Sequence, residues 1–195
     1  MSSTEDFIER VKADFDQKEY RPELVLVAYT NKRVLFVKSA RSGVWNLPQE
    51  GVKKGEKPRD VFLRGWLEEL CHINIPSGAE IEETVKTWVE KEYFGESPEY
   101  RFIHEKEAET PGRSRSGFSR GKKYYFVAVR LVKPDIVGLS EKVCPEEISD
   151  IELIDKADAH ILMVNSGVAI RKRHIVSDAL GKLGLEKEEE IEQSD

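Results

Sequence analysis

The chain lacks most features that would place it in a membrane, outside the cell or on nucleic acid. It holds two cysteines among 195 residues, too few for a disulfide framework. No apolar run reaches the length that spans a bilayer, and the first ten residues are polar and acidic, unlike a signal peptide. The net charge of −6 argues against a surface that binds nucleic acid throughout. These absences predict a soluble protein of the reducing cytoplasm with no membrane partner.

What is present is the composition of an ordinary globular protein. Hydrophobic residues make up 39% of the chain and charged residues 35%, and the length suffices for one domain with a buried core. We expect an N-terminal helical extension over 1–19, one domain over 20–184 and an acidic, disordered tail over 185–195. Within the domain, the polar stretch 96–121 is predicted to be a long insert, either functional or mobile.

Hydrophobic periodicity divides the chain into helices and strands. Helices are predicted at residues 3–19, 58–70, 157–163 and 168–183. Strands are predicted at residues 24–29, 33–37, 82–93, 123–132 and 148–154, with a short extended piece at 45–48. The first two strands are separated by a three-residue turn, which indicates a hairpin.

Charged residues gather at the end of the predicted helix 58–70. Glu68 and Glu69 are adjacent, Arg64 lies one turn earlier, and Glu56 precedes the helix in a glycine-containing loop. Adjacent carboxylates repel unless a positive charge lies between them, and Mg²⁺ prefers such oxygen ligands and shares them with substrate phosphates. The competing interpretation of two glutamates on a helix is a solvated face.

The segment that contains these residues resembles a known motif. Residues 50–72, EGVKKGEKPRDVFLRGWLEELCH, are similar to the Nudix box, G-x5-E-x7-R-E-U-x-E-E-x-G-U, in which U is apolar. The matching positions are Glu56, Arg64, Trp66, Glu68 and Glu69. Because these positions recur in order and at the right spacing, the match is more specific than the glutamate pair alone.

The resemblance extends beyond the box. Other segments are similar to the Nudix branch of RNA 5′-pyrophosphohydrolases and diadenosine polyphosphate hydrolases, namely Tyr20-Arg21-Pro22, Trp45-x-Leu47-Pro48-Gln49, Gly121–Phe126, Pro145–Ile148 and Arg171–Arg173. The ordered set covers roughly residues 20–183. It implies the Nudix fold, an α/β (α+β) domain with a mixed β-sheet sandwiched between helices.

The resemblance also implies a reaction. It points to hydrolysis of a phosphoanhydride bond in a nucleotide, a dinucleoside polyphosphate or an RNA 5′ end, with Mg²⁺ or Mn²⁺ as cofactor. By position, the expected metal ligands are Glu56, Glu68, Glu69 and Glu147, with Glu146 as the alternative to Glu147. Arg64 is expected to orient Glu68 or Glu56, and it joins Glu68, Glu69 and Glu147 in the expected catalytic group.

Several cations are candidates for phosphate contacts. Those singled out are Arg21, Lys38, Lys122 and Lys123. Arg21 and Lys122 occupy matching positions in the branch, and Lys38 follows a strand that alternates toward the site. The alternative for each is an ordinary surface cation. The arginines of the 96–121 stretch, at 113, 115 and 120, either capture an RNA backbone or solubilise the loop, and the second interpretation is favoured.

Three positions depart from the box. Gly65 stands where the box has the glutamate after arginine, Glu50 where it has its first glycine, and Cys71 where it has its last. The change at Gly65 removes one carboxylate from the expected cluster. Three readings of Glu50 stay open: it partly replaces that carboxylate, it blocks the site, or it binds a basic side chain.

These departures leave two main functions in competition. A metal-dependent hydrolase is favoured, because the remaining glutamates suffice to hold at least one metal. The alternative is a catalytically weak or inactive Nudix module that binds a nucleotide, an RNA 5′ end or a protein. A third interpretation is that the fold serves as a scaffold for an assembly, but no residue pattern requires this. Neither the nucleobase nor the oligomeric state has a signal in the sequence.

Overall fold

The computed structural model describes residues 4–71, 79–109, 117–132 and 145–183. The predicted acidic tail and the arginines at 113 and 115 lie outside these described residues. None of the described helices combines the length and the apolar character needed to cross a bilayer.

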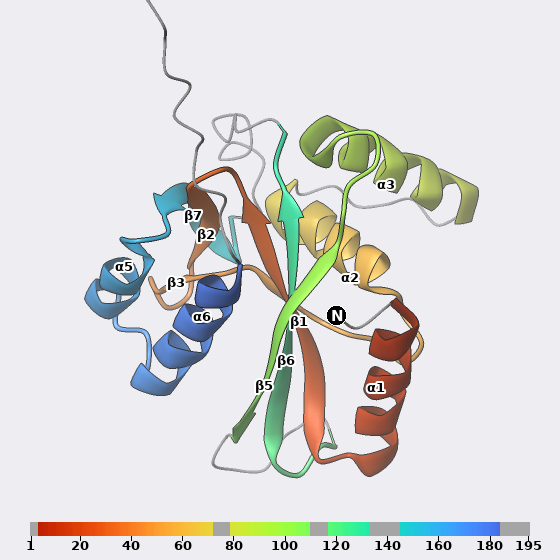
Figure 1. Ribbon diagram of the computed structural model, residues 1–195, viewed down its shortest axis with the longest axis horizontal. Helices are drawn as coiled ribbons and strands as arrows, with labels where there is room; N and C mark the ends of the chain where they lie inside the picture. The colour runs from red at the N-terminus through yellow and green to blue at the C-terminus, as the bar shows by residue number, and fades with distance from the viewer. Residues whose placement is uncertain (1–3, 72–78, 110–116, 133–144, 184–195) are drawn as a thin grey trace, which may run out of the picture.

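A mixed sheet runs through the centre of the molecule (Figure 1). Its strands are β1(Tyr20–Tyr29), β2(Arg33–Ser39), β3(Trp45–Asn46), β4(Gln49–Gly51), β5(Arg101–Glu109), β6(Gly121–Arg130) and β7(Ile148–Asp155). The order across the sheet is β3-β2-β1-β6-β5, with β4 paired to β1 and β7 paired to β2. β1 and β6 are parallel, whereas the other pairs are antiparallel.

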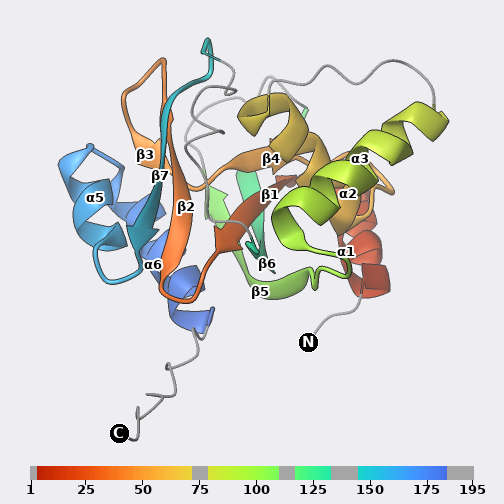
Figure 2. The ribbon, with the colours of Figure 1, turned by 90° about the horizontal axis from the view of Figure 1, so that it is seen from above.

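Helices cover both faces of the sheet (Figures 1 and 2). They are α1(Thr4–Gln17), α2(Pro58–Gly65), a π-helical turn η1(Trp66–Leu70), α3(Ala79–Phe94), α5(Ala159–Asn165) and α6(Ile170–Lys182). Figures 1 and 2 show α1, α2 and α3 on one side and α5 and α6 on the other, and the buried residues of η1 pack with the first group. The predicted α/β (α+β) fold, a mixed sheet between helices, is therefore confirmed.

Strand β1 shows why the sheet has a core on each face. Successive side chains of a strand point to opposite faces. Leu24 and Leu26 therefore pack with α1 and α2, whereas Val25 and Val27 pack with α5 and α6. A strand covered on both faces reads as a continuous apolar run, and β1 has this pattern from Leu24 to Ala28.

The prediction of a strand at 82–93 is wrong, because these residues belong to α3. Val85, Val89 and Tyr93 recur at four-residue spacing and pack on the core, which is a helical period. Lys86 bonds Glu82 one turn earlier at 2.6 Å. The content of valine, threonine and aromatic residues suggested a strand, but tertiary packing of the apolar stripe decided for a helix.

The prediction of an irregular insert over 96–121 is wrong for its middle. Residues 101–109 form β5, which pairs with β6 in antiparallel fashion. Its charged run from His104 to Glu107 hid the strand, because an edge strand carries polar side chains that the sequence does not distinguish from a loop. The other predicted helices and strands are confirmed in type, with ends displaced by a few residues.

Helix α1 is anchored to the sheet by Phe7, which is 1% exposed. Its ring packs against Phe102 and Tyr125 at centroid distances of 5.0 and 5.2 Å. We expect Phe7→Ala to lower the free energy of unfolding by about 3–5 kcal/mol in urea titrations, with a single transition. Glu9→Ala, on the solvent side of the same helix, should change it by less than about 0.5 kcal/mol. A Phe7→Ala loss as small as that of Glu9→Ala would mean that α1 is a peripheral extension.

Candidate active site

Helix α2 leads directly into η1, the turn that carries Glu68 and Glu69. Pro58 occupies the start of the helix, where its missing N–H costs nothing. Val61, Phe62 and Trp66 are fully buried against the core, and this burial turns the polar side of the helix toward the loop that precedes it.

The last turn of this helix is π-helical rather than α-helical as predicted. The Cys71 N–H donates to the carbonyl of Trp66 at 3.0 Å, a five-residue step. A π turn widens the spacing of side chains and is frequent at functional sites. Glu68 is exposed to solvent here and Glu69 is half-buried, so the two adjacent carboxylates differ in their access to water.

Arg64 is the centre of the polar network beside this turn. Its Nε and Nη2 donate to the two carboxylate oxygens of Glu56, both at 3.0 Å, and Nη2 also donates to the carbonyl of Gly51 at 2.8 Å. Nη1 lies 2.8 Å from Oε1 of Glu50. Burial by itself would lower the pKa of Arg64, but the hydrogen bonds and charges of Glu56 and Glu50 outweigh it and raise the pKa. Of its two predicted partners, Arg64 therefore orients Glu56 and not Glu68.

Glu50 lies against Gly65. Its Oε1 accepts a hydrogen bond from the Gly51 N–H at 2.8 Å and faces Arg64. A Cβ added at Gly65 would lie 3.2 Å from Cβ of Glu50 and 3.2 Å from Cδ1 of Leu26. Among the three readings of Glu50, the structure shows the contact with a basic side chain, and it adds that Glu50 fills the space beside Gly65.

The carboxylates around the turn influence one another. Burial raises the pKa of Glu69 to about 8, and the charges of Glu50, Glu147 and Glu68 add to this effect against the opposing charge of Arg64. Burial also raises the pKa of Glu68, and Glu50 and Glu147 contribute again. Repulsion among four carboxylates is the electrostatic condition that a bound cation relieves.

The fit to a divalent metal is chemical rather than geometric. Within the ranges that the structure describes, no three acidic, histidine or cysteine side chains converge closely enough to hold an ion as they stand. The carboxylate oxygens of Glu50, Glu68, Glu69 and Glu147 nevertheless match the ligands that Mg²⁺ and Mn²⁺ prefer. Glu56 fits less well, because Arg64 and the Lys53 N–H already donate to its oxygens.

A cavity of about 210 Å³ opens beside Glu69. Glu147 lines it as well, whereas Glu146 does not. On the side of α6 it is lined by Lys172, whose Nζ bonds Oε1 of Gln49 at 3.3 Å. Burial lowers the pKa of Lys172 to about 8. Two carboxylates and one ammonium group therefore share a single hollow.

Two predicted phosphate contacts lie near this region. The guanidinium of Arg21 rests on Gly51, where a Cβ would be only 2.7 Å from Nη2. Lys122 pairs with the buried carboxylate of Glu23 at 2.7 Å, and its charge contributes to the low pKa of Lys172. Arg21 therefore lies beside Gly51, next to Glu50, and Lys122 lies on the face of the sheet that α6 and Lys172 cover.

The other two predicted contacts point elsewhere. Lys123 follows Lys122 in β6 and so projects to the opposite face, where it pairs with Asp14 at 3.0 Å. Lys38 lies 5.8 Å from the ring centroid of Trp45, whereas its neighbours Val37 and Ser39 line the cavity. The structure does not bring either lysine to the carboxylates.

The sequence interpretation missed Lys172 and Gln49 as site residues. Both stand in segments that resemble the family, the basic triplet 171–173 and the W-x-L-P-Q segment. The only signal available was their place in those motifs, because nothing in the sequence says that α6 returns to the end of β4.

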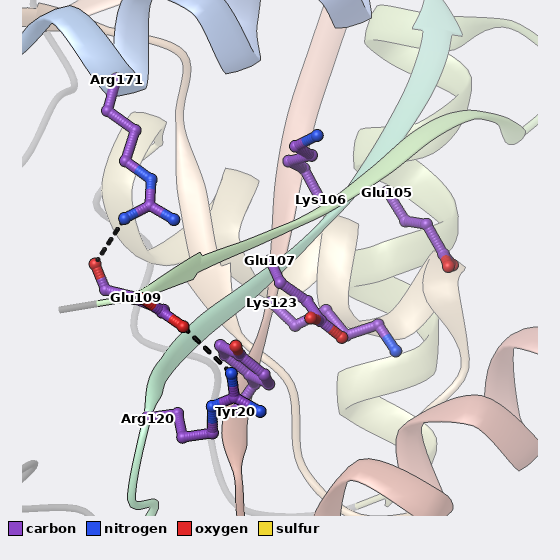
Figure 3. Close-up of a pocket in the computed structure, with 8 residues that line it drawn as sticks. All are labelled: Tyr20, Glu105, Lys106, Glu107, Glu109, Arg120, Lys123 and Arg171. Atoms are coloured by element: carbon purple, nitrogen blue, oxygen red, sulfur yellow. Dashed lines mark hydrogen bonds and ion pairs between the residues drawn. The ribbon is translucent and has the colours of Figure 1, made fainter.

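A larger hollow of about 450 Å³ lies elsewhere, along β5 and β6 (Figure 3). Arg171 donates to the Glu109 carbonyl at 3.3 Å, and Arg120 pairs with the Glu109 carboxylate at 3.0 Å. Arg120 also lies 5.2 Å from the ring centroid of Tyr20. None of the box carboxylates lines this hollow, and the groups of its walls neutralise one another, so it is not the candidate site.

Comparison with known proteins identifies the family of the chain. The NUDIX domain model matches residues 20–176. The chain therefore belongs to the NUDIX domain family, which confirms the predicted family resemblance.

The individual relatives and solved structures match this chain over part of its length or at low sequence identity. An RNA pyrophosphohydrolase of a Nitratiruptor species is 37% identical over 76 residues, which cover 36% of this chain and 49% of the relative. The match thus spans about half the length of that protein. The E. coli dihydroneopterin triphosphate pyrophosphohydrolase matches with a TM-score of 0.51 and 15% identity over 85% of this chain and 98% of its own. A C. elegans Ap4A hydrolase has a TM-score of 0.47 and 16% identity over 84% and 94%.

Proposed function

We propose that the chain is a metal-dependent hydrolase of a phosphoanhydride bond in a nucleotide, a dinucleoside polyphosphate or an RNA 5′ end. One observation carries the proposal: Glu69, Glu147 and Lys172 line the same cavity beside the box. A phosphate group fits between a metal held by carboxylates and an ammonium group, because it needs positive charge on both sides.

The roles of the carboxylates follow from their surroundings. Glu68, Glu69 and Glu147 are the proposed ligands of Mg²⁺ or Mn²⁺, which, when bound, neutralises phosphate oxygens and lowers the pKa of its water. Glu56 acts as a positioning residue, since it holds Arg64 through two hydrogen bonds. Arg64 in turn holds the loop through the Gly51 carbonyl.

Lys172 is the leading phosphate contact, with Arg21 and Lys122 as outer contacts. Lys172 lines the cavity itself. Arg21 is exposed beside the loop, where it can meet a longer polyphosphate, and Lys122 is partly neutralised by Glu23. Lys38 and Lys123 have no part in this proposal. An RNA 5′ end is the favoured substrate class, because the 37% identical relative carries the name RNA pyrophosphohydrolase.

The deciding experiment is a substrate panel with Mg²⁺, with Mn²⁺ and without metal. It holds triphosphorylated RNA, dinucleoside polyphosphates, nucleotide sugars and nucleoside triphosphates, and release of phosphate and nucleotide is measured. Metal-dependent release that Glu68→Gln and Glu69→Gln both abolish supports the proposal. Release no greater than that of the mutants on every substrate would sink it.

A binding module without turnover is the second candidate. The observation that favours it is that the carboxylates of the described residues do not converge on one point. The same panel, repeated as a binding assay, separates the candidates: a binding module retains its ligand unchanged for hours with Mg²⁺ present.

The position of Lys172 predicts a pH effect on the reaction. The groups around it are Lys122, Glu23 and Gln49, and Glu69 and Glu147 line the same cavity. The pKa of Lys172 is lowered to about 8, so the ammonium charge is present below that pH and is lost above it. At saturating metal, kcat/KM should therefore fall as pH rises through about 8. Because Arg keeps its charge, Lys172→Arg should delay that fall, and an identical profile for the two proteins would contradict the role.

A further inference from the structure

Glu50 packs so closely against Gly65 that a side chain at position 65 would crowd it. A Cβ at Gly65 would lie 3.2 Å from Cβ of Glu50 and 3.5 Å from its Cγ. Cβ is the fixed root of the Glu50 side chain, so it cannot swing away as a flexible tip would. The third close atom is Cδ1 of Leu26, a fully buried core residue. Any side chain at 65 therefore competes with Glu50 for space.

The carboxylate of Glu50 reaches the same surroundings as the box glutamates. Its Oε1 is fixed by the Gly51 N–H and by Arg64, each at 2.8 Å, and its side chain is 19% exposed. Gly65, which packs against Glu50, precedes Glu68 and Glu69 by one turn of the same helical segment. A carboxylate rooted in the loop thus stands beside the pair on the helix, although position 65 provides none.

We propose that the metal-binding carboxylate has moved from the helix to the loop. Glu50 supplies it from the loop, and Gly65 supplies none from the helix. Gly65 is kept without a side chain because Glu50 fills its space. The inference rests on the proposed function and deepens it. It assigns Glu50 a place in the metal site, whereas a purely structural role would make it only a counter-ion of Arg64.

The first test is Mn²⁺ binding by metal-free protein, followed by electron paramagnetic resonance. Glu50→Gln keeps an oxygen that accepts from Gly51 and Arg64, so the fold is preserved while the charge is lost. We expect its Mn²⁺ affinity to fall about tenfold or more. Glu90→Gln is the matched control, because Glu90 is a partly buried carboxylate that pairs with Arg59 at 2.9 Å away from the site. Its affinity should stay within about twofold of wild type.

The second test exchanges the two residues. Gly65→Glu alone adds a carboxylate where Glu50 blocks it, so we expect a lower melting temperature and no gain in Mn²⁺ affinity. The double variant Glu50→Gly with Gly65→Glu removes the contact with Glu50 and leaves only the one with Cδ1 of Leu26, and its Mn²⁺ affinity should exceed that of Glu50→Gly by about tenfold. The double variant remains informative even where Gly65→Glu alone does not fold.

The outcomes separate the inference from the proposed function. Wild-type affinity in Glu50→Gln, together with lost affinity in Glu69→Gln, overturns the role of Glu50 and leaves the metal site standing. A double variant no better than Glu50→Gly also overturns the inference. Mn²⁺ binding that neither Glu50→Gln nor Glu69→Gln reduces removes both the inference and the metal site on which it rests.

Discussion

Glu69→Gln is expected to lower the metal-dependent kcat/KM by about 10³-fold. Glu69 faces the cavity, and a metal there is worth several kcal/mol of transition-state stabilisation, each 1.4 kcal/mol being about tenfold in rate. The change keeps the shape of the side chain and removes only its charge. The measurement is initial rates on the substrate that the panel identifies, over a range of Mg²⁺ concentrations.

The matched control for Glu69→Gln is Glu146→Gln. Glu146 is exposed next to Glu147 but does not line the cavity, so its rate should stay within about twofold of wild type. In metal-free protein, Glu69→Gln should not be destabilised, because burial and neighbouring carboxylates already disfavour the charged form of Glu69. Loss of activity accompanied by loss of folding would argue against a role in metal binding.

Arg64→Ala is expected to lower the free energy of unfolding by about 3–5 kcal/mol, because it leaves Glu50 and Glu56 without their shared cation. The Arg64 side chain is 13% exposed, and those of Glu50 and Glu56 are 19% and 14% exposed, so water replaces the lost partner poorly. Urea titration monitored by tryptophan fluorescence measures the change. Arg64→Lys should lie in between, since it keeps the charge and loses the paired hydrogen bonds.

The control for Arg64 is Arg33→Ala. Arg33 pairs with Asp155 at 3.5 Å, with side chains 60% and 51% exposed. Exposed pairs contribute little, so the expected loss is below about 1 kcal/mol. If Arg64→Ala cost no more than Arg33→Ala, the network around Arg64 would not be what holds the loop to the helix.

Two elements were predicted wrongly from the sequence. The strand expected at 82–93 is a helix, because Val85, Val89 and Tyr93 recur at four-residue spacing and pack on the core as one helical face. The edge strand 101–109 looked like a loop, because its charged side chains face solvent and its pairing with β6 is a long-range event. Local composition describes preference, whereas packing and pairing depend on residues far along the chain.

The sequence by itself determined the family, the mixed α/β fold and the identity of the box residues, since motif order and spacing are properties of the chain. It also named Glu56 and Glu68 as the two possible partners of Arg64, and the structure shows the bond with Glu56. Only the tertiary structure decided that Lys172 and Glu69 line one cavity and that Lys123 turns away from it. It also decided that Glu50 fills the space beside Gly65. The physical reason is that strand alternation and the return of α6 to the end of β4 set which side chains meet, and neither is written in local sequence.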